Sequence, residues 1–152
     1  MRTEEWVGQR LGTDLVWGVR ETFLRYVEGV GGAVEVVSPA VRTPEGAVRF
    51  PLSRETSGQL EFSGGVAFRA HRGALHVSFS DPSLEPVHGA EGGALLTVTD
   101  TSTGSPARIV LATVDVAGNV ALADEALALF DFQYPAGTAL DPIAFADPLP
   151  GG

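Results

Sequence analysis

The spacing of hydrophobic residues along the chain changes once, near Gly32. Before that point, a helical period of apolar side chains runs through Leu15, Val16, Val19, Phe23 and Val27, and Trp17 and Leu24 broaden the stripe. Thr13 or Asp14 can cap the start of a helix, and Gly29 is a natural end. The pattern therefore predicts one short amphipathic helix over Leu15–Val27.

Beyond Gly32 the period is two, which is typical of β-strands. The predicted strands are Ala33–Val37, Ala47–Pro51, Gly58–Phe62, Val66–His71, Ala74–Ser80, Ala94–Thr99 and Ala107–Val114. Turn residues separate them at Pro44-Glu45-Gly46, Gly64-Gly65, Asp81-Pro82, Gly92-Gly93, Thr103-Gly104-Ser105-Pro106 and Gly118-Asn119. Ala121–Phe130 fits either period. Short strands joined by turns indicate a mainly β chain, an antiparallel β-sandwich or barrel-like domain with one short N-terminal α-helix.

One hairpin can be placed in register from its alternation. With Arg72-Gly73 as a two-residue loop, one face of the hairpin carries Val66, Phe68, Ala70, Leu75, Val77 and Phe79. The same register puts His71 at the hairpin tip, on the opposite face with Arg69, His76 and Ser78. The first face is the one that we expect to be buried.

Length and charge narrow the function classes. A chain of 152 residues with 44% hydrophobic and 19% charged residues fits one globular domain, which we place over 1–152. The formal net charge is −9, and no basic run occurs. Nucleic acid and anionic membrane surfaces are therefore not expected partners.

The absence of cysteine excludes several chemistries. Disulfides, thiolate nucleophiles and cysteine metal sites are impossible, and Met1 is the sole methionine. The polar start, Met1 to Glu5, predicts no signal peptide, and no apolar run is long enough to span a bilayer. We expect no membrane insertion.

No motif brings catalytic groups together, so we do not expect an enzyme. GxSxG and GxxxxGK[ST] are both absent, and His71 and His76 do not have a standard zinc spacing. Two polar groups, Asp100 with Thr101 and Thr103 and Asp115 with Asn119, lack the ligand density of a calcium loop.

A haem site makes other demands: an axial donor, an apolar slot and polar groups for the propionates. The donors available here are histidine and tyrosine. A tyrosinate oxygen favours ferric iron, but an unperturbed tyrosine has a pKa of about 10, so a neighbouring histidine donor would help it. A tyrosine near a helix end also commonly serves packing, and a hairpin-tip histidine is commonly solvated. Residue spacing alone leaves these alternatives open.

Three segments resemble the HtaA domain family, the haem-binding module of haem-uptake proteins in corynebacteria and other actinobacteria. Trp17–Val27 (WGVRETFLRYV) is similar to the family's WGVKxSFxxY opening. Phe62–Leu75 (FSGGVAFRAHRGAL) is similar to its FxGxVxFxGHxGxL hairpin, and Phe132–Pro142 (FQYPAGTALDP) to its closing FYPAGTxLDP. The segments follow in the family's order and span nearly the whole chain.

This resemblance implies a protein that takes up or relays ferric haem b. Tyr26 matches the iron-ligating tyrosine, His71 matches the histidine that hydrogen-bonds to it, and Thr22 stands where the family commonly has serine. Secretion or cell-surface location is also implied, with haemoproteins or other haem-uptake proteins as partners. One position departs from the family pattern: Ala70 replaces the glycine before the histidine.

Two other functions remain as alternatives. A structural or adhesive β-domain could keep this fold without a ligand, and a weak haem-degrading or peroxidase-like enzyme is a third possibility. We expect Tyr134 to pack the closing segment against the body. The cations nearest in sequence for the propionates are Arg25, Arg69 and Arg72.

Overall fold

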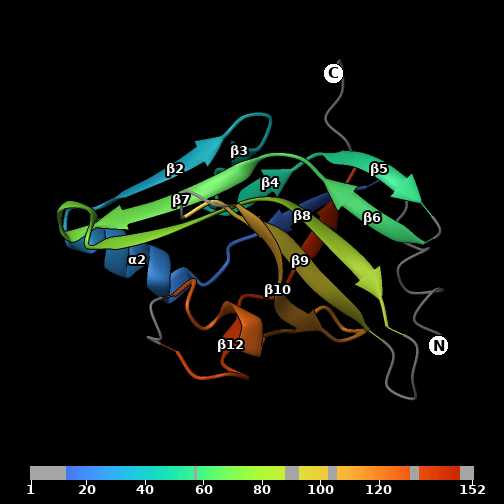
Figure 1. Cartoon of the computed structure of the whole chain (residues 1–152). Coiled ribbons are helices and arrows are strands. Elements are labelled where there is room, and N and C mark those ends of the chain that lie inside the picture. Colours follow the sequence, from blue (N-terminus) through green and yellow to red (C-terminus); the bar gives the residue numbers. More distant parts are fainter. Residues whose placement is uncertain (1–12, 57, 88–92, 103–105, 131–133, 148–152) are drawn as a thin grey trace.

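Two antiparallel sheets and one α-helix form the described part of the chain (Figure 1). A computed structural model describes residues 13–56, 58–87, 93–102, 106–130 and 134–147. The helix is α2 (Glu21–Gly29), and two 3-10 turns span His71–Gly73 and Asp124–Ala126. The predicted fold class, mainly β and antiparallel with one short helix, is confirmed.

The smaller sheet has four strands, in the order β13 (Ala144–Ala146), β1 (Asp14–Trp17), β4 (Val48–Phe50) and β3 (Val41–Arg42). The larger sheet runs through β12 (Ala139–Leu140), β11 (Val120–Leu122), β10 (Ala107–Val114), β9 (Ala94–Asp100), β8 (Leu75–Pro86), β6 (Gln59–Phe62) and β5 (Leu52–Thr56). Off this path, β7 (Gly65–Ala70) pairs with β8 and with β2 (Ala33–Val37). Every pair is antiparallel, and the long β7–β8 hairpin extends over α2 (Figure 1).

The predicted helix is wrong over its first half. Asp14–Trp17 is strand β1, which pairs with β4 and β13. The Asp14 carboxylate is buried there, where it accepts hydrogen bonds from the Leu52 backbone N–H (2.9 Å) and the Arg49 guanidinium (3.1 Å). The chain then turns at Val19, whose φ of 64° excludes a continuous helix. The N-cap residue is consequently Arg20, not Thr13 or Asp14, whereas the end at Gly29 is as expected.

Bulges interrupt the alternation of the large sheet in β5, β8 and β10. β2 and β10 have the predicted bounds, but β8 continues through Asp81-Pro82, which we expected to be a turn. These residues form a bulge, because the register skips between Ser80 and Ser83 and Asp81 has a φ of 51°. The Asp81 N–H donates to the Gly64 carbonyl at 2.8 Å, which fixes the bend.

Other expectations were incomplete. The ambiguous segment Ala121–Phe130 contains the end of β11 and a 3-10 turn, and the alternation did not reveal the short strands β3, β5, β12 and β13. Turns form at Gly46 and Gly118, as predicted. Gly92 of one predicted turn, residues 103–105 of another, and Phe132-Gln133 of the closing motif lie outside the described residues.

Candidate functional site

Helix α2 presents Tyr26 to solvent because its other face is committed to the core. Phe23, Leu24 and Val27 are buried, and the Phe23 ring meets Phe68 of β7 edge-on at a centroid distance of 5.1 Å. Tyr26 is 50% exposed. Because half of the side chain is exposed, the Tyr26 hydroxyl is available to a partner from another element.

The β7–β8 hairpin supplies that partner. Ala70 pairs with Leu75, Phe68 with Val77, and Val66 with Phe79, as the sequence predicted. Among these, Val66, Phe68, Ala70, Val77 and Phe79 are buried, which confirms the core face.

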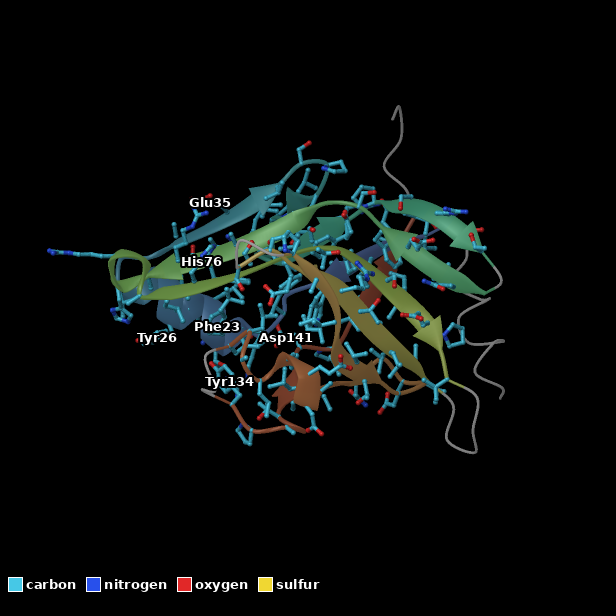
Figure 2. The ribbon with its side chains drawn as sticks, viewed as in Figure 1. Phe23, Tyr26, Glu35, His76, Tyr134 and Asp141 are labelled. Carbon is cyan, nitrogen blue, oxygen red and sulfur yellow. The ribbon has the colours of Figure 1, made fainter. Side chains whose placement is uncertain are left out.

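His71, in contrast, does not share a face with Arg69 and His76 as we expected. It begins the 3-10 turn with a φ of 53°, and Arg72 follows with a φ of 57°. These two left-handed residues take the His71 ring out of the strand alternation. Glu35 and His76 lie on the side of the sheet away from Phe23 and Tyr26 (Figure 2).

The structure brings Tyr26 and His71 together although they are 45 positions apart. The Tyr26 hydroxyl lies 2.7 Å from His71 Nε2, and the ring centroids are 5.9 Å apart. A neutral phenol donates its proton to an unprotonated Nε2, whereas a phenolate accepts a hydrogen bond from Nε2–H. The pair can therefore hold a proton or stabilise an anionic oxygen at the surface. We call it the Tyr26–His71 site.

A short connection aligns the two elements. The helix ends at Gly29, Gly32 N–H donates to the Val27 carbonyl at 2.8 Å, and β2 starts at Ala33, opposite Arg69 of β7. A side chain at Gly32 would collide with the Arg69 carbonyl oxygen and would lie 3.0 Å from the Ala70 methyl. Ala70 is buried, so the methyl group that it has in place of the family glycine lies in the core.

Thr22, the third predicted site residue, lies one turn before Tyr26 and is exposed. Its Oγ1 accepts a hydrogen bond from Arg20 Nη1 at 2.7 Å, and it makes no hydrogen bond to Tyr26 or His71. The structure thus places Thr22 beside the site but not in contact with the pair.

The charges around α2 differ from our expectation. Arg25 pairs with Glu21 on the helix, and Arg69 Nη1 pairs with Glu35 at 3.2 Å, so two of the three expected cations are already bound to carboxylates. Arg72 forms no ion pair with a described residue. Sequence reasoning missed Arg20, because nothing local signals its contact with a distant ring.

That ring belongs to Tyr134. The Arg20 guanidinium carbon lies 4.7 Å from its centroid, and Tyr134 packs edge-on against Phe23 (6.3 Å) and Phe130 (6.1 Å). Tyr134 therefore anchors the closing segment to the body, as expected. The labelled Tyr26, Phe23 and Tyr134 follow one side of the molecule from the hairpin end toward the closing segment (Figure 2).

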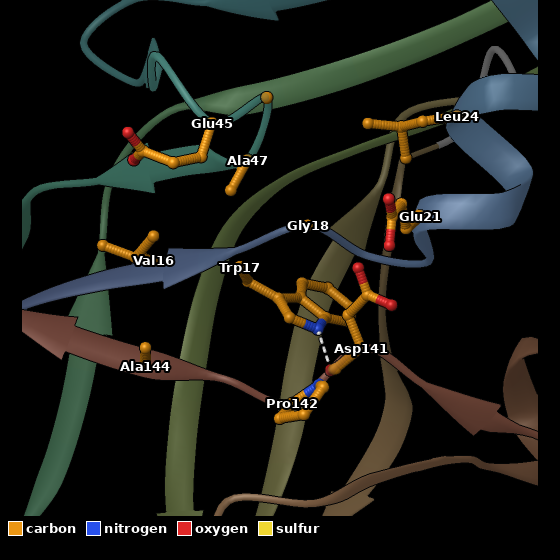
Figure 3. A pocket seen from close by; sticks show the side chains of 11 residues that line it. Val16, Trp17, Gly18, Glu21, Leu24, Glu45, Ala47, Asp141, Pro142 and Ala144 are labelled. Carbon is orange, nitrogen blue, oxygen red and sulfur yellow. Dashed lines mark hydrogen bonds between the residues drawn. The ribbon is translucent and has the colours of Figure 1, made fainter.

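A separate cleft lies on the other side of α2 (Figure 3). Its volume is about 470 Å³, and Trp17, Glu21, Leu24, Glu45 and Asp141 are among its lining residues. Leu24 is two positions from Tyr26, which at about 100° per residue sets it on the opposite helix face. Trp17 Nε1 donates to the Asp141 carbonyl at 2.6 Å. We call this the Trp17 cleft; it contains no predicted site residue.

A polar cleft lies over the bend of β8. Its lining includes Arg108, whose Nη2 donates to Thr97 Oγ1 at 2.9 Å. Burial lowers the pKa of Arg108, and the carboxylates of Asp81, Glu85 and Glu61 oppose that shift. The guanidinium is already hydrogen-bonded to the sheet.

Across the described residues, no group of three or more histidine, cysteine, aspartate or glutamate side chains is arranged to hold a metal ion. Within the same part of the chain, no helix has the length and apolar character needed to cross a membrane.

Comparison with known proteins identifies the family of this chain. Residues 12–146 match the family model HtaA. The chain belongs to the HtaA family. No curated protein sequence matches it.

Solved structures of the same fold come from Corynebacterium glutamicum. The haem-binding protein HtaB is 24% identical with a TM-score of 0.66, over 88% of this chain and 91% of that one. The C-terminal domain of HtaA is 22% identical with a TM-score of 0.64, over 88% and 93%. The N-terminal domain of HtaA is 20% identical with a TM-score of 0.64, over 88% and 94%. At these identities the likeness demonstrates a shared fold.

Proposed function

We propose that this chain is a haem-binding module, a single domain over 1–152, that takes up or relays ferric haem b. Tyr26 is the proposed iron ligand, and His71 is its hydrogen-bonding partner. The observation that carries the proposal is the 2.7 Å contact between the Tyr26 hydroxyl and His71 Nε2 on a surface where Tyr26 is half exposed. Membership of the HtaA family and structural likeness to a haem-binding protein support it.

The residues present fit such a group. A single tyrosinate oxygen is sufficient as the protein's axial donor, so a cluster of metal ligands is not needed. Ferric haem would supply a Lewis-acidic iron that favours the ionised phenol. His71 then keeps Nε2 protonated and donates to the Tyr26 oxygen, which fixes its direction and adjusts how strongly it donates charge.

Exposure suits transfer rather than catalysis. Tyr26 and His71 both lie on the surface, where a donor or acceptor haemoprotein can approach. An exchange site needs this access, whereas a haem-degrading or peroxidase-like enzyme also needs acid–base groups held over the reacting face. We therefore propose a binding and relay role in haem and iron acquisition, at the cell surface or after secretion.

A ferric haem titration followed by absorbance tests this function. Wild type is expected to bind saturably with a tyrosinate-type high-spin spectrum, and Tyr26→Phe is expected to lose more than about 100-fold in affinity because the axial oxygen is gone. Tyr134→Phe removes the chain's other phenol and serves as the matched control, with affinity unchanged.

Two results would contradict the proposal. Equal affinity in Tyr26→Phe would remove Tyr26 as the ligand. No saturable binding by wild type would leave the structural or adhesive β-domain as the better account.

A further inference from the structure

The polar cleft over the bend of β8 lies far from the Tyr26–His71 site. Residues of β5, β6, β8, β9 and β10 line it. In Figure 1, β5 and β6 lie at one end of the molecule, and α2 and the tip of the β7–β8 hairpin lie at the other. The volume of the cleft is about 470 Å³, within the range of about 300–1,000 Å³ that small-molecule sites have. A ligand held here would leave Tyr26 accessible.

The cleft holds a buried hydrogen-bond donor that no described residue uses. Ser83 and Thr97 line the cleft and are only 1% and 4% exposed. Their hydroxyl oxygens lie 2.7 Å apart, and Thr97 Oγ1 also accepts a hydrogen bond from Arg108 Nη2 at 2.9 Å. Two hydroxyls carry two hydrogens, and the bond between them uses one. The other hydrogen has no acceptor among the described residues, a cost that an acceptor atom in the cleft would remove.

The cleft also presents polar groups with little or no use within the protein. The Glu85 carboxylate makes neither a hydrogen bond nor an ion pair with a described residue. Glu61 is paired with Arg54 only at 3.9 Å. The Gln59 side-chain amide makes no hydrogen bond within the described part of the chain. Acceptors and a buried donor therefore line the same hollow.

This combination selects the class of ligand. Three carboxylates line the cleft, those of Glu61, Asp81 and Glu85. They outnumber the Arg108 guanidinium and disfavour an anion such as a phosphate. An ammonium or guanidinium ligand has no acceptor for the buried hydroxyl hydrogen, and an apolar ligand would leave the polar lining unpaired. A neutral sugar meets both demands, because each of its hydroxyls donates one hydrogen bond and accepts others.

We propose that the polar cleft binds a short segment of a neutral sugar chain. The unused hydrogen of the Ser83–Thr97 pair donates to a sugar oxygen, and the Glu85 carboxylate accepts from a sugar hydroxyl. The inference does not depend on the proposed haem function. A protein attached to a glycan at this end would keep the Tyr26–His71 site open for exchange.

Titration of the whole chain with neutral oligosaccharides, followed by backbone amide NMR signals, tests the assignment. The probes are maltotriose, cellotriose, mannotriose and tri-N-acetylchitotriose. At least one should bind saturably, with a dissociation constant of about 1 mM or lower. The amide signals of Ser83, Glu85 and Thr97 should shift, and that of Tyr26 should not.

Two variants remove the proposed contacts with the probe that binds. Glu85→Gln should weaken binding about 10-fold, because a charge-assisted hydrogen bond becomes a neutral one. Ser83→Ala combined with Thr97→Val removes both hydroxyls and should also cost about 10-fold. The matched control is Glu45→Gln, which neutralises a carboxylate of the Trp17 cleft and should bind as wild type does. Thermal unfolding of each variant separates a loss of binding from a loss of fold.

Absence of saturable binding to every probe would mean that the cleft holds water alone, and it would overturn the inference. Undiminished binding in Glu85→Gln and in the double variant, or an equal loss in Glu45→Gln, would overturn it as well. Tyr26→Phe should bind the sugar as wild type does, so that failure of the haem proposal leaves this one standing.

The source of the sugar is a separate comparison. A free polysaccharide built from the sugar that binds and a glycoprotein that carries it present the same chemistry to the cleft. Binding of wild type to either one, with a loss of about 10-fold in Glu85→Gln, supports the inference and identifies the source.

Discussion

The Tyr26–His71 site and the Trp17 cleft lie on opposite faces of the same helix, yet they differ in what their polar groups are used for. In the Trp17 cleft, the indole N–H donates to the Asp141 carbonyl and the Asp141 N–H donates to the Val19 carbonyl at 2.8 Å. These bonds join β1 to the closing segment. The polar groups of the Trp17 cleft are therefore already used to hold two segments of the chain together.

The polar groups of the Tyr26–His71 site are turned outward, with Tyr26 half exposed and His71 on the surface. The Tyr26 hydroxyl and the His71 imidazole contact each other, and neither is bound to a described carboxylate. The Arg20 guanidinium stacks on the Tyr134 ring and donates hydrogen bonds to Thr22 Oγ1 and the Ala139 carbonyl. The comparison teaches that the Trp17 cleft and the candidate pair use their polar groups differently: those of the cleft join two segments of the chain, and those of the pair meet at the surface.

The largest expected effect is a loss of stability when a residue of the Trp17 cleft is replaced. Trp17→Ala should lower the free energy of unfolding by about 3–5 kcal/mol, because a fully buried indole and its hydrogen bond to Asp141 are lost. Tyr26→Phe removes one exposed hydrogen bond and should cost about 1 kcal/mol or less. Denaturant unfolding of both variants checks the contrast, which would fail if Tyr26→Phe proved as destabilising as Trp17→Ala.

The second-largest expected effect is faster loss of haem when the Tyr26–His71 site is changed. His71→Ala should speed the loss of ferric haem about 10–100-fold and shift the absorbance spectrum, since the hydrogen bond that orients the Tyr26 oxygen is removed. The control is His76→Ala, on the other side of the hairpin, where Nε2 is buried without a partner among the described residues. Transfer to excess apomyoglobin measures both rates. Equal rates in the two variants would exclude His71 from the site.

A smaller effect, on pH dependence, should appear at a turn remote from both regions. The Asn119 backbone N–H is the main donor that lowers the pKa of Asp115 below its ordinary value. The ionised carboxylate therefore stabilises the fold above about pH 4, and this contribution is lost as the pH falls through the lowered pKa. Because Asp115 is exposed and water screens its charge, Asp115→Asn should cost only a few tenths of a kcal/mol, roughly 0.5 at pH 7 and less at pH 3, by denaturant unfolding. A cost that did not shrink on acidification would contradict this origin.

The smallest expected effect is none at all. Glu45 lines the Trp17 cleft and is exposed, so Glu45→Gln should leave both stability and haem affinity unchanged, within about 0.5 kcal/mol. Haem titration of this variant tests whether the cleft participates in binding. A clear loss of affinity would break the separation of the two regions.

Local patterns predicted those features whose cause is local. Alternation was sufficient for β2 and the register of the β7–β8 hairpin, because a one-residue slip would turn Val66, Phe68 and Val77 out of the core. It also gave the bounds of β10 but not the bulge between Val110 and Ala112. The candidate pair came from motif resemblance. The same resemblance implied the hydrogen bond between the two residues, whereas its 2.7 Å geometry and the turn of His71 out of the strand alternation required the structure.

Features with distant causes were missed. Asp14–Trp17 has a helical pattern, but its partners are Phe50 and Phe145 on strands far along the chain. Tertiary pairing therefore overrides the local period. Arg20 likewise gains its position from the Tyr134 ring and the Ala139 carbonyl, which no spacing in the sequence connects to it.

The connection through Gly32 has a thermodynamic consequence for ligand exchange. A three-residue connection joins α2 to β2, β2 pairs with β7, and His71 directly follows the last residue of β7. A closed ring of chain and hydrogen bonds therefore sets the distance between the Tyr26 and His71 rings. Little conformational entropy remains to be lost when a ligand arrives. Nothing in this ring has to refold when the ligand leaves. In the proposed function, the bond between the iron and the Tyr26 oxygen would then set the rate of haem exchange. A substitution of His71 would be enough to change that rate.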